Sequence, residues 1–323
     1  MTDSEILERI PKLSALVIGD ICLDRWCTYY PALAEPSRET GIPRIGVTAT
    51  EVTPGAGGTI ANNLAALGTG RVSVLGAIGD DGFGYELARA LNERGISSEF
   101  LVKAPGMQTF TYTKLINGTD RVEDRPRVDF ITTTPLDPAV ERRILDQIQA
   151  VFDIFDILLI SDQAETDRGG VVTPAVRELL ADLAPNYPDK VFLVDSRTRI
   201  DLFRNLTIKP NRQEAELACY KLFGRVDFQR LREHVCAKFL IVTHGPDGVL
   251  VIDEAGENWV RSRAIEHPVD ICGAGDSFAA GMSLALAATH SPMRAAAIGT
   301  RVASITIMKP GTGTASPREV LAG

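Results

Sequence analysis

The stretch Asp270-Ile271-Cys272-Gly273-Ala274-Gly275-Asp276-Ser277 follows an apolar run and opens a predicted helix of small residues over 275–288. Gly273 and Gly275 let successive amide N–H groups turn toward one point, where the positive end of the helix reinforces them. These amides form a candidate anion hole. Asp276 at its rim would repel a stored phosphate, but it suits a base that takes a proton from a hydroxyl while the amides hold a transferring phosphoryl group. The alternative is that Asp276 only caps the helix.

The rest of the chain alternates between two patterns. Short runs rich in Val, Ile and Leu, typical of strands buried on both faces, lie at 13–18, 72–78, 157–160, 191–194, 239–243 and 249–252. Segments with apolar residues at helical spacing lie between them, at 84–94, 173–183 and 211–223. This alternation predicts a doubly wound, mostly parallel α/β sheet flanked by helices, within a single domain over 1–323.

Two segments break the alternation. Residues 29–53 contain three prolines and then alternating residues, and 100–134 is rich in Thr, Val and charge without a helical period. Both patterns indicate strands of a small, partly exposed sheet. We expect the two segments to meet as a β-sheet lid over the mouth of the main sheet. The alternative is two ordinary surface excursions.

Composition narrows the class of partner. Lys and Arg number 34 against 42 Asp and Glu, which gives a net charge of −8 and no broad cationic surface for nucleic acid. The five cysteines are scattered, the N-terminus lacks signal-peptide character, and no apolar run approaches the ~20 residues that span a bilayer. A cytoplasmic protein without a membrane partner is expected. The sequence has no G-x-x-x-x-G-K-[ST] and no G-x-G-x-x-G, so P-loop enzymes and dinucleotide-dependent oxidoreductases lack their signatures.

Residues 270–276 resemble the D-T-x-G-A-G-D signature of the ribokinase-like, or PfkB, family of carbohydrate kinases. Other stretches resemble family features in the same order along the chain, at 19–25, 54–68, 78–84, 209–214, 242–248 and 309–313. The resemblance implies the ribokinase-like fold and ATP-dependent transfer of a phosphoryl group to a sugar hydroxyl. It implies that Asp276 is the catalytic base, that Gly273, Ala274 and Gly275 form the anion hole, and that Mg²⁺ is required.

The resemblance also assigns binding residues. It places Asp24, Gly57, Gly58, Thr59 and Asn63 on the substrate, and Lys209, Asn211, Thr243, Gly245, Gly248 and Gly275 on ATP. Asn211 and Glu214 would order magnesium through water, and Asp270 would help to form a potassium site. From the residues alone, Asp24 could instead form a turn, and Asn211 with Glu214 could close a capping box at a helix start. The stretches at 242–248 and 309–313 could be a plain hairpin and loop.

Within the family the likeness is nearest to heptose 7-phosphate kinases, the kinase half of a bifunctional enzyme of lipopolysaccharide precursor synthesis. Three departures affect the site: Thr59 stands where that group has asparagine, Cys272 replaces the usual threonine, and 161–166 lacks the aromatic and lysine of S-D-Y-x-K-G. The phosphate-transfer residues are kept, but the sugar pocket differs, so the exact substrate is not inherited.

A phosphorylated substrate would need a cation at its distal end. Arg38 or Arg44, in the predicted lid, could supply a planar fork for that phosphate. Alternatively, these arginines are solvated charges on an exposed strand. The leading hypothesis is a kinase for a sugar or sugar phosphate, able to form a homodimer through the lid. The alternatives are a nucleoside kinase of the same fold and a non-catalytic family member that binds nucleotide or sugar.

Overall fold

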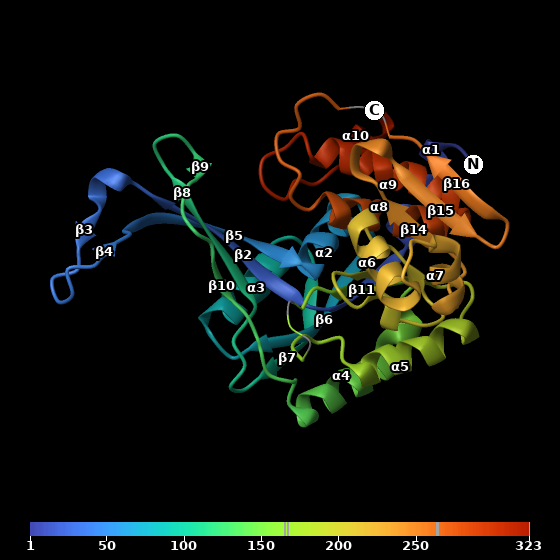
Figure 1. Ribbon diagram of the computed structural model, residues 1–323, viewed down its shortest axis with the longest axis horizontal. Coiled ribbons are helices and arrows are strands. Elements are labelled where there is room, and N and C mark those ends of the chain that lie inside the picture. The colour runs from blue at the N-terminus through green and yellow to red at the C-terminus, as the bar shows by residue number, and fades with distance from the viewer. Residues whose placement is uncertain (165, 167, 263–264, 323) are drawn as a thin grey trace.

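Nine strands form the central sheet of the computed structural model, which describes residues 1–164, 166, 168–262 and 265–322 (Figure 1). Their order across the sheet is β16-β15-β14-β13-β12-β11-β1-β6-β7. The bounds are β1 Ser14–Gly19, β6 Arg71–Gly79, β7 Ser97–Ala104, β11 Ile157–Asp162, β12 Val191–Ser196, β13 Thr207–Ile208, β14 Leu240–Thr243, β15 Val249–Asp253 and β16 Gly256–Val260. Neighbours from β7 to β14 are parallel, and β15 and β16 add an antiparallel edge.

Helices cover both faces of this sheet because its strands are apolar on both sides. In β1, Ala15 and Val17 belong to one buried cluster, whereas Leu16 and Ile18 belong to the other. The first cluster includes residues from α1 Asp3–Leu7, α2 Gly57–Ala66, α3 Gly82–Asn92, α8 Ala274–Thr289, α9 Pro292–Thr306 and α10 Pro317–Ala322. The second includes residues from α4 Pro138–Val151, α5 Pro174–Leu183, α6 Arg212–Phe223 and α7 Phe228–His234. The expected doubly wound α/β architecture is confirmed.

A second sheet, separate from the first, forms the lid. Its strands are β2 Ile21–Tyr29, β5 Val47–Ala56, β8 Thr111–Asn117, β9 Val122–Glu123 and β10 Val128–Phe130, and at the far tip β3 Glu35–Pro36 pairs with β4 Pro43–Arg44. The two segments expected to meet do so, because β2 lies between β5 and β8. The boundaries differ from the expected ones: the lid begins at Ile21, and 100–104 belongs to β7 of the main sheet.

The chain leaves the main sheet for the lid at Gly19. This residue has φ +129°, and a Cβ there would lie 2.1 Å from the carbonyl oxygen of Ser161 on the neighbouring strand. Only glycine fits such a close approach. The chain returns through Ala56, at φ 51°, directly into α2. The lid therefore joins the body beside the carboxyl ends of the parallel strands, where open α/β sheets bind ligands. Among the described residues no helix has the length and apolar character of a membrane span.

Candidate active site

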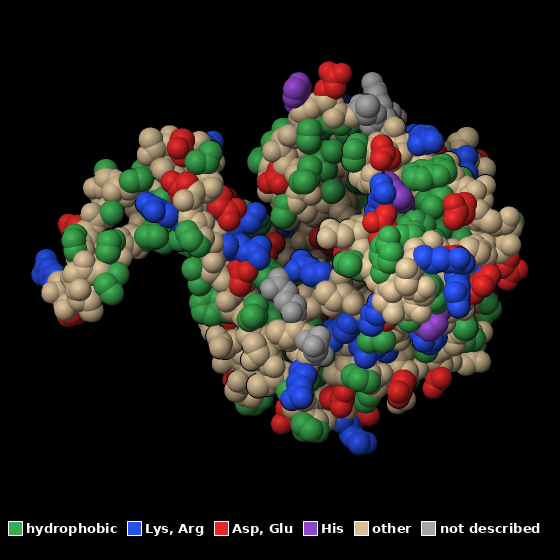
Figure 2. All heavy atoms as spheres, viewed as in Figure 1, with side chains coloured by type: hydrophobic (Ala, Val, Ile, Leu, Met, Phe, Trp, Pro, Cys, Tyr) green, Lys and Arg blue, Asp and Glu red, His purple; other side chains and the backbone are tan. Residues whose placement is uncertain are grey.

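A cavity of about 190 Å³ lies where the lid meets the body. Its walls are formed by Asp24, Arg25, Trp26, Tyr112, Lys114 and Arg127 of the lid, and by Ala56, Thr59, Gln163, Arg197, Cys272, Gly273, Asp276 and Thr312. Figure 2 shows the hollow between lid and body, with basic side chains gathered beside it. Residues distant in sequence, among them Asp24 and Asp276, are thus brought into one cleft.

The N-terminus of α8 opens into this cleft. Gly273 is the N-cap residue, with φ +77° and no side-chain cap, so Asp276 in the third helical position does not cap the helix. The Ala274 amide, expected in the anion hole, instead donates to the carbonyl of Ile271 at 3.2 Å. The next amides, of Gly275 and Asp276, have no intrahelical partner because they lie in the first turn. Together with the helix dipole they suit an anion.

Charged groups around Asp276 set its protonation. Burial, together with the charges of Asp195 and Asp24, raises the pKa of Asp276 to about 8, and Lys209 and Arg197 limit this rise. A carboxyl group whose pKa lies near neutrality can accept a proton effectively in catalysis, because base strength and the deprotonated fraction are both substantial there. Perturbed carboxyl groups in clefts are candidates for functional groups.

Lys209 lies behind the anion hole. It follows β13 and forms an ion pair with Asp195 of the neighbouring strand β12 at 3.0 Å, and only 3% of its surface is exposed. Burial alone would lower its pKa, but Asp195 and Glu214 raise it overall. A Cβ added to Gly275 would lie 3.8 Å from the Lys209 Nζ. The ammonium group is therefore adjacent to the first turn of α8.

Asp24 lies on β2, on the lid side of the same cleft, paired with Thr53 of β5 and Tyr112 of β8. Burial raises its pKa to about 6, although Lys114 and Arg127 lower it. The carboxylate fits over Gly55, where an added Cβ would lie 2.4 Å from an oxygen of Asp24. The carboxylate is therefore a hydrogen-bond acceptor in the cleft wall, and its position depends on glycine at residue 55.

The start of α2 contributes to the wall of the same cleft. Gly57 and Gly58 are buried, and a Cβ on either would meet a side chain at 2.7 Å or less. Thr59 lines the cleft and lies against Gly273, so the N-termini of α2 and α8 meet. Asn63 does not line the cleft: it is fully buried and its Nδ2 donates to the Thr59 carbonyl at 3.0 Å.

The residues expected to bind magnesium and ATP lie beside Lys209. Asn211 caps α6 and forms a capping box with Glu214, through bonds of 2.9 and 2.8 Å. The capping alternative is thus realised in the structure, and burial raises the pKa of the Glu214 carboxyl. Asn211 also forms a bridge with Thr243, ahead of the turn containing Gly245 and Gly248. No cluster of three metal-ligating His, Cys, Asp or Glu side chains occurs in the described part of the chain.

Asp270 connects two loops at the edge of the site. Its carboxylate accepts hydrogen bonds from the amides of Cys272 at 2.8 Å and Gly311 at 3.1 Å. It therefore holds the anion-hole turn against the C-terminal loop, whose Thr312 lines the cleft.

The two lid arginines are not brought to the site. Arg38 and Arg44 are exposed near the β3–β4 tip, which projects away from the body, and Arg44 bonds Glu35 at 2.9 Å (Figure 1). Sequence reasoning missed other cations, Lys114, Arg127 and Arg197, which do line the cleft. Arg197 could have been found, because it lies three residues beyond the predicted strand 191–194 and ligands bind near the carboxyl ends of such strands.

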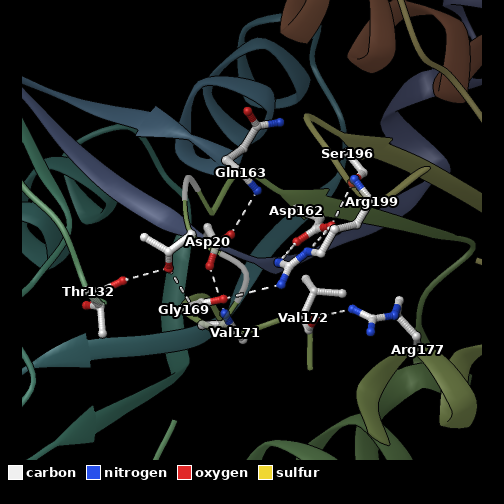
Figure 3. Close-up of polar contacts among 11 residues, drawn as sticks. Asp20, Thr132, Asp162, Gln163, Gly169, Val171, Val172, Arg177, Ser196 and Arg199 are labelled. Atoms are coloured by element: carbon white, nitrogen blue, oxygen red, sulfur yellow. Dashed lines mark hydrogen bonds and ion pairs between the residues drawn. The ribbon is translucent and has the colours of Figure 1, made fainter. Parts of the chain in front are cut away.

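Residues 161–164 of the altered segment lie beside a buried polar cluster (Figure 3). Asp162 bonds Arg199 and, at 2.6 Å, Ser196. Asp20 accepts hydrogen bonds at 2.8 Å from the amides of Gln163 and Val171. Figure 3 shows the Gln163 side chain pointing away from this cluster, and Gln163 lines the cleft.

Glu165, which belongs to the same sequence departure, lies outside the described residues. The segment lacks the lysine of S-D-Y-x-K-G. The cation beside Asp162 is instead Arg199, which follows the neighbouring strand β12.

A mostly parallel sheet, a β-sheet lid and a carboxyl group at a helix N-terminus define the class of ribokinase-like sugar kinases. Solved structures share this fold. Ribokinase from Thermotoga maritima superposes with a TM-score of 0.70 at 19% identity, covering 96% of this chain and 98% of that one. Phosphofructokinase-2 from Escherichia coli, in complex with potassium, gives 0.72 at 20% identity, covering 96% and 97%.

The family follows from the sequence comparison. Residues 13–319 match the pfkB family of carbohydrate kinases, and the chain belongs to this family. Curated relatives include the bifunctional protein HldE of Pelobacter propionicus, 29% identical over 324 residues, and that of Citrifermentans bemidjiense, 30% identical over 321. Each alignment covers 98% of this chain and 64% of the relative, so the chain spans about two thirds of these proteins' length.

Proposed function

We propose that the protein transfers the γ-phosphoryl group of magnesium-ATP to a hydroxyl of a sugar phosphate, with Asp276 as the general base. The observation that carries this proposal is the Asp276 carboxyl group at the N-terminus of α8, in one cleft with Asp24. Asp24 accepts a hydrogen bond from a substrate hydroxyl. The reacting hydroxyl gives its proton to Asp276 as its oxygen bonds to the γ-phosphorus, and the bond to the β,γ-bridging oxygen breaks with its electron pair leaving on ADP.

The nucleotide lies on the side of the cleft where α8, β13 and β14 meet. First-turn amides of α8 and the Lys209 ammonium group stabilise the phosphates. Asn211 and Glu214 would hold the magnesium ion through water while they also cap α6, since one carboxylate oxygen of Glu214 serves the cap and the other remains for a water molecule. The turn after Thr243 lies along the nucleotide. Potassium bound near Asp270 would activate the enzyme.

The distal phosphate of the substrate contacts Lys114 and Arg127 instead of Arg38 or Arg44. Lys114 and Arg127 line the cleft and both act on the Asp24 carboxyl group, whereas the other two lie at the lid tip. The Arg127 guanidinium also lies 4.9 Å from the centre of the Tyr112 ring, which holds the planar group at the cleft wall. The resemblance of the sequence to heptose 7-phosphate kinases supports a heptose phosphate as the acceptor, although the HldE relatives are less than one third identical.

A nucleoside is the second candidate acceptor, because two aromatic side chains, Trp26 and Tyr112, line the cleft. A nucleobase could stack on either of them.

The lid would also join two copies of the chain. Its outer part exposes apolar side chains, and exposed apolar surface on a sheet favours association. These side chains are Tyr30, Leu33, Ile42, Ile45, Val47, Val122 and Val128. Light scattering on the purified chain should give the mass of a dimer, and substitution of Leu33 and Ile42 by lysine should give the monomer.

A cytoplasmic location agrees with the five free thiols.

An ADP-release assay with magnesium-ATP tests the activity. The acceptor panel is fructose 6-phosphate, sedoheptulose 7-phosphate, fructose, ribose and adenosine. We expect turnover with a sugar phosphate and its loss in Asp276→Asn. Lys114→Ala and Arg127→Ala should raise the KM for that acceptor at least tenfold, a loss of about 1.4 kcal/mol in binding.

Arg38→Ala and Arg44→Ala are the matched controls and should behave as wild type. Preference for a free sugar would refute the phosphate subsite, and preference for adenosine would establish the second candidate. Absence of ADP release with every acceptor would refute the kinase reaction for this panel.

A further inference from the structure

Three cationic side chains gather at the carboxyl ends of β12 and β13, and their surroundings differ. Lys209 is buried against Asp195, and Arg199 is held by Asp162 within the polar cluster of Figure 3. Arg197, the first residue after β12, is exposed and lines the cleft together with Gly273 and Asp276. Lys209 and Arg199 thus lie against buried carboxylates, and Arg197 lines the space in which a ligand would lie.

The charge of Arg197 influences two functional groups. Its positive charge acts on Asp276, at the start of α8, and on Glu214, in the first turn of α6. These two helices approach the cleft from different directions, one carrying the base and the other the residues placed beside magnesium. Because Arg197 lines the cleft together with Gly273 and Asp276, it borders the space in which the proposed phosphoryl transfer would take place.

The charge balance of the cleft calls for a cation there. Asp24, Asp195 and Asp276 approach one another closely enough for the two others to raise the pKa of Asp276. Lys209 forms an ion pair with Asp195 at 3.0 Å, so the charge of Lys209 is already largely balanced before any ligand binds. Transfer of a phosphoryl group adds charge on its three peripheral oxygens beside the remaining carboxyl groups. Guanidinium presents several N–H donors in one plane and suits those oxygens better than an ammonium group does.

We propose that Arg197 is a further catalytic residue that donates hydrogen bonds to the peripheral oxygens of the transferring phosphoryl group. This inference rests on the proposed kinase reaction. No covalent bond to Arg197 forms or breaks. The acceptor oxygen bonds to phosphorus, its proton passes to Asp276, and the electron pair of the bond to the bridging oxygen leaves with ADP. Arg197 stabilises the charge on the group in flight, so its effect falls on the transfer step more than on the binding of either substrate.

Kinetics of Arg197→Gln and Arg197→Lys in the full chain test this inference, with magnesium-ATP and whichever acceptor of the panel gives the highest kcat/KM. We expect Arg197→Gln to lower kcat by about 10²- to 10³-fold, with the KM of the acceptor within threefold of wild type. Arg197→Lys should retain more activity because it keeps the charge. Guanidinium ion at millimolar concentration should partly restore Arg197→Gln. Arg212→Gln, which removes an exposed arginine outside the cleft, is the matched control and should stay within threefold.

The pH profile provides a readout that a merely structural role would not move. Arg197 lowers the pKa of Asp276, a group that also faces Asp195, Lys209 and Asp24. Removal of the guanidinium should therefore shift the acidic limb of kcat/KM to higher pH. An Arg197→Gln variant with wild-type kcat, or with a loss confined to the KM of ATP, would overturn the inference. If wild type releases ADP and Asp276→Asn does not, such a result for Arg197→Gln refutes only the role of Arg197 and leaves the kinase reaction in place. If wild type itself releases no ADP, the kinase reaction fails and the role of Arg197 fails with it.

Discussion

Asp276→Asn should make the protein more stable while it removes activity. Burial and the neighbouring carboxyl groups raise the pKa of Asp276 from 3.8 to about 8, so the folded protein disfavours the ionised form. Each pKa unit corresponds to about 1.4 kcal/mol, which places the cost of the ionised carboxylate at no more than about 6 kcal/mol. The side chain borders an open cleft, where water reduces that figure. We expect Asp276→Asn to increase the free energy of unfolding by about 2–3 kcal/mol at pH 8.5.

The sign and the pH range follow from linkage. A carboxyl group with a raised folded-state pKa destabilises the fold increasingly from its unfolded pKa, 3.8, up to its folded pKa, about 8. At pH 5 only a small part of this cost is present, so the gain from Asp276→Asn should fall to about 1 kcal/mol or less. The assay is urea unfolding of both proteins at pH 5 and pH 8.5.

Asp80→Asn is the control, because Asp80 is an exposed carboxylate with a surface ion pair, and its effect should be within about 0.5 kcal/mol at both pH values. Equal stability of wild type and Asp276→Asn at pH 8.5 would refute the electrostatic reasoning. In the same preparation kcat should fall by about two to four orders of magnitude, and activity within threefold of wild type would refute Asp276 as the base.

Three further substitutions or conditions examine other parts of the cleft. Gly275→Val should weaken ATP binding, measured by calorimetry, at least tenfold, with little change in melting temperature. The valine side chain would lie near the Lys209 Nζ, where phosphate must approach. Tight ATP binding by this variant would contradict the anion hole. Gly55→Val should raise the KM of the acceptor at least tenfold and leave the KM of ATP unchanged. The reason is that a Cβ at residue 55 would lie 2.4 Å from the Asp24 carboxylate and displace it. An unchanged acceptor KM would show that the position of this carboxylate does not matter for acceptor binding. Turnover should be faster in potassium than in sodium buffer if an ion binds near Asp270, and identical rates would exclude that role.

The parallel core could be predicted because its strands bury both faces. Runs such as 157–160 and 191–194 are apolar without alternation, and they became β11 and β12 with ends no more than two residues away. β13, Thr207–Ile208, has only two residues and is too short to leave a periodic pattern. The lid boundaries were less accurate because β7 has intermediate and exposed positions like those of a lid strand, although it pairs with β6.

The site divides in the same way. The turn before α8 needs Gly273 at φ +77°, so backbone geometry restricts the sequence to a short, contiguous pattern that can be recognised. Arg38 and Arg44 lie on the segment that carries the lid, but the β3–β4 tip takes them away from the cleft. How far a lid residue lies from the cleft depends on the length and register of the lid strands, and amino-acid composition does not specify either.

Lys114 and Arg127 show why the substrate side resists prediction. Lys114 pairs with Trp26 in the parallel β8–β2 ladder and thereby reaches the wall beside Asp24. Nothing in the sequence near Lys114 indicates Trp26 as its partner, because the pairing joins residues almost 90 positions apart. The phosphate-transfer half is built from local backbone conformation and the acceptor half from long-range strand register. A sequence of this kind therefore identifies the reaction before it identifies the substrate, and exchange of lid strands between relatives should alter the acceptor preference while the role of Asp276 is retained.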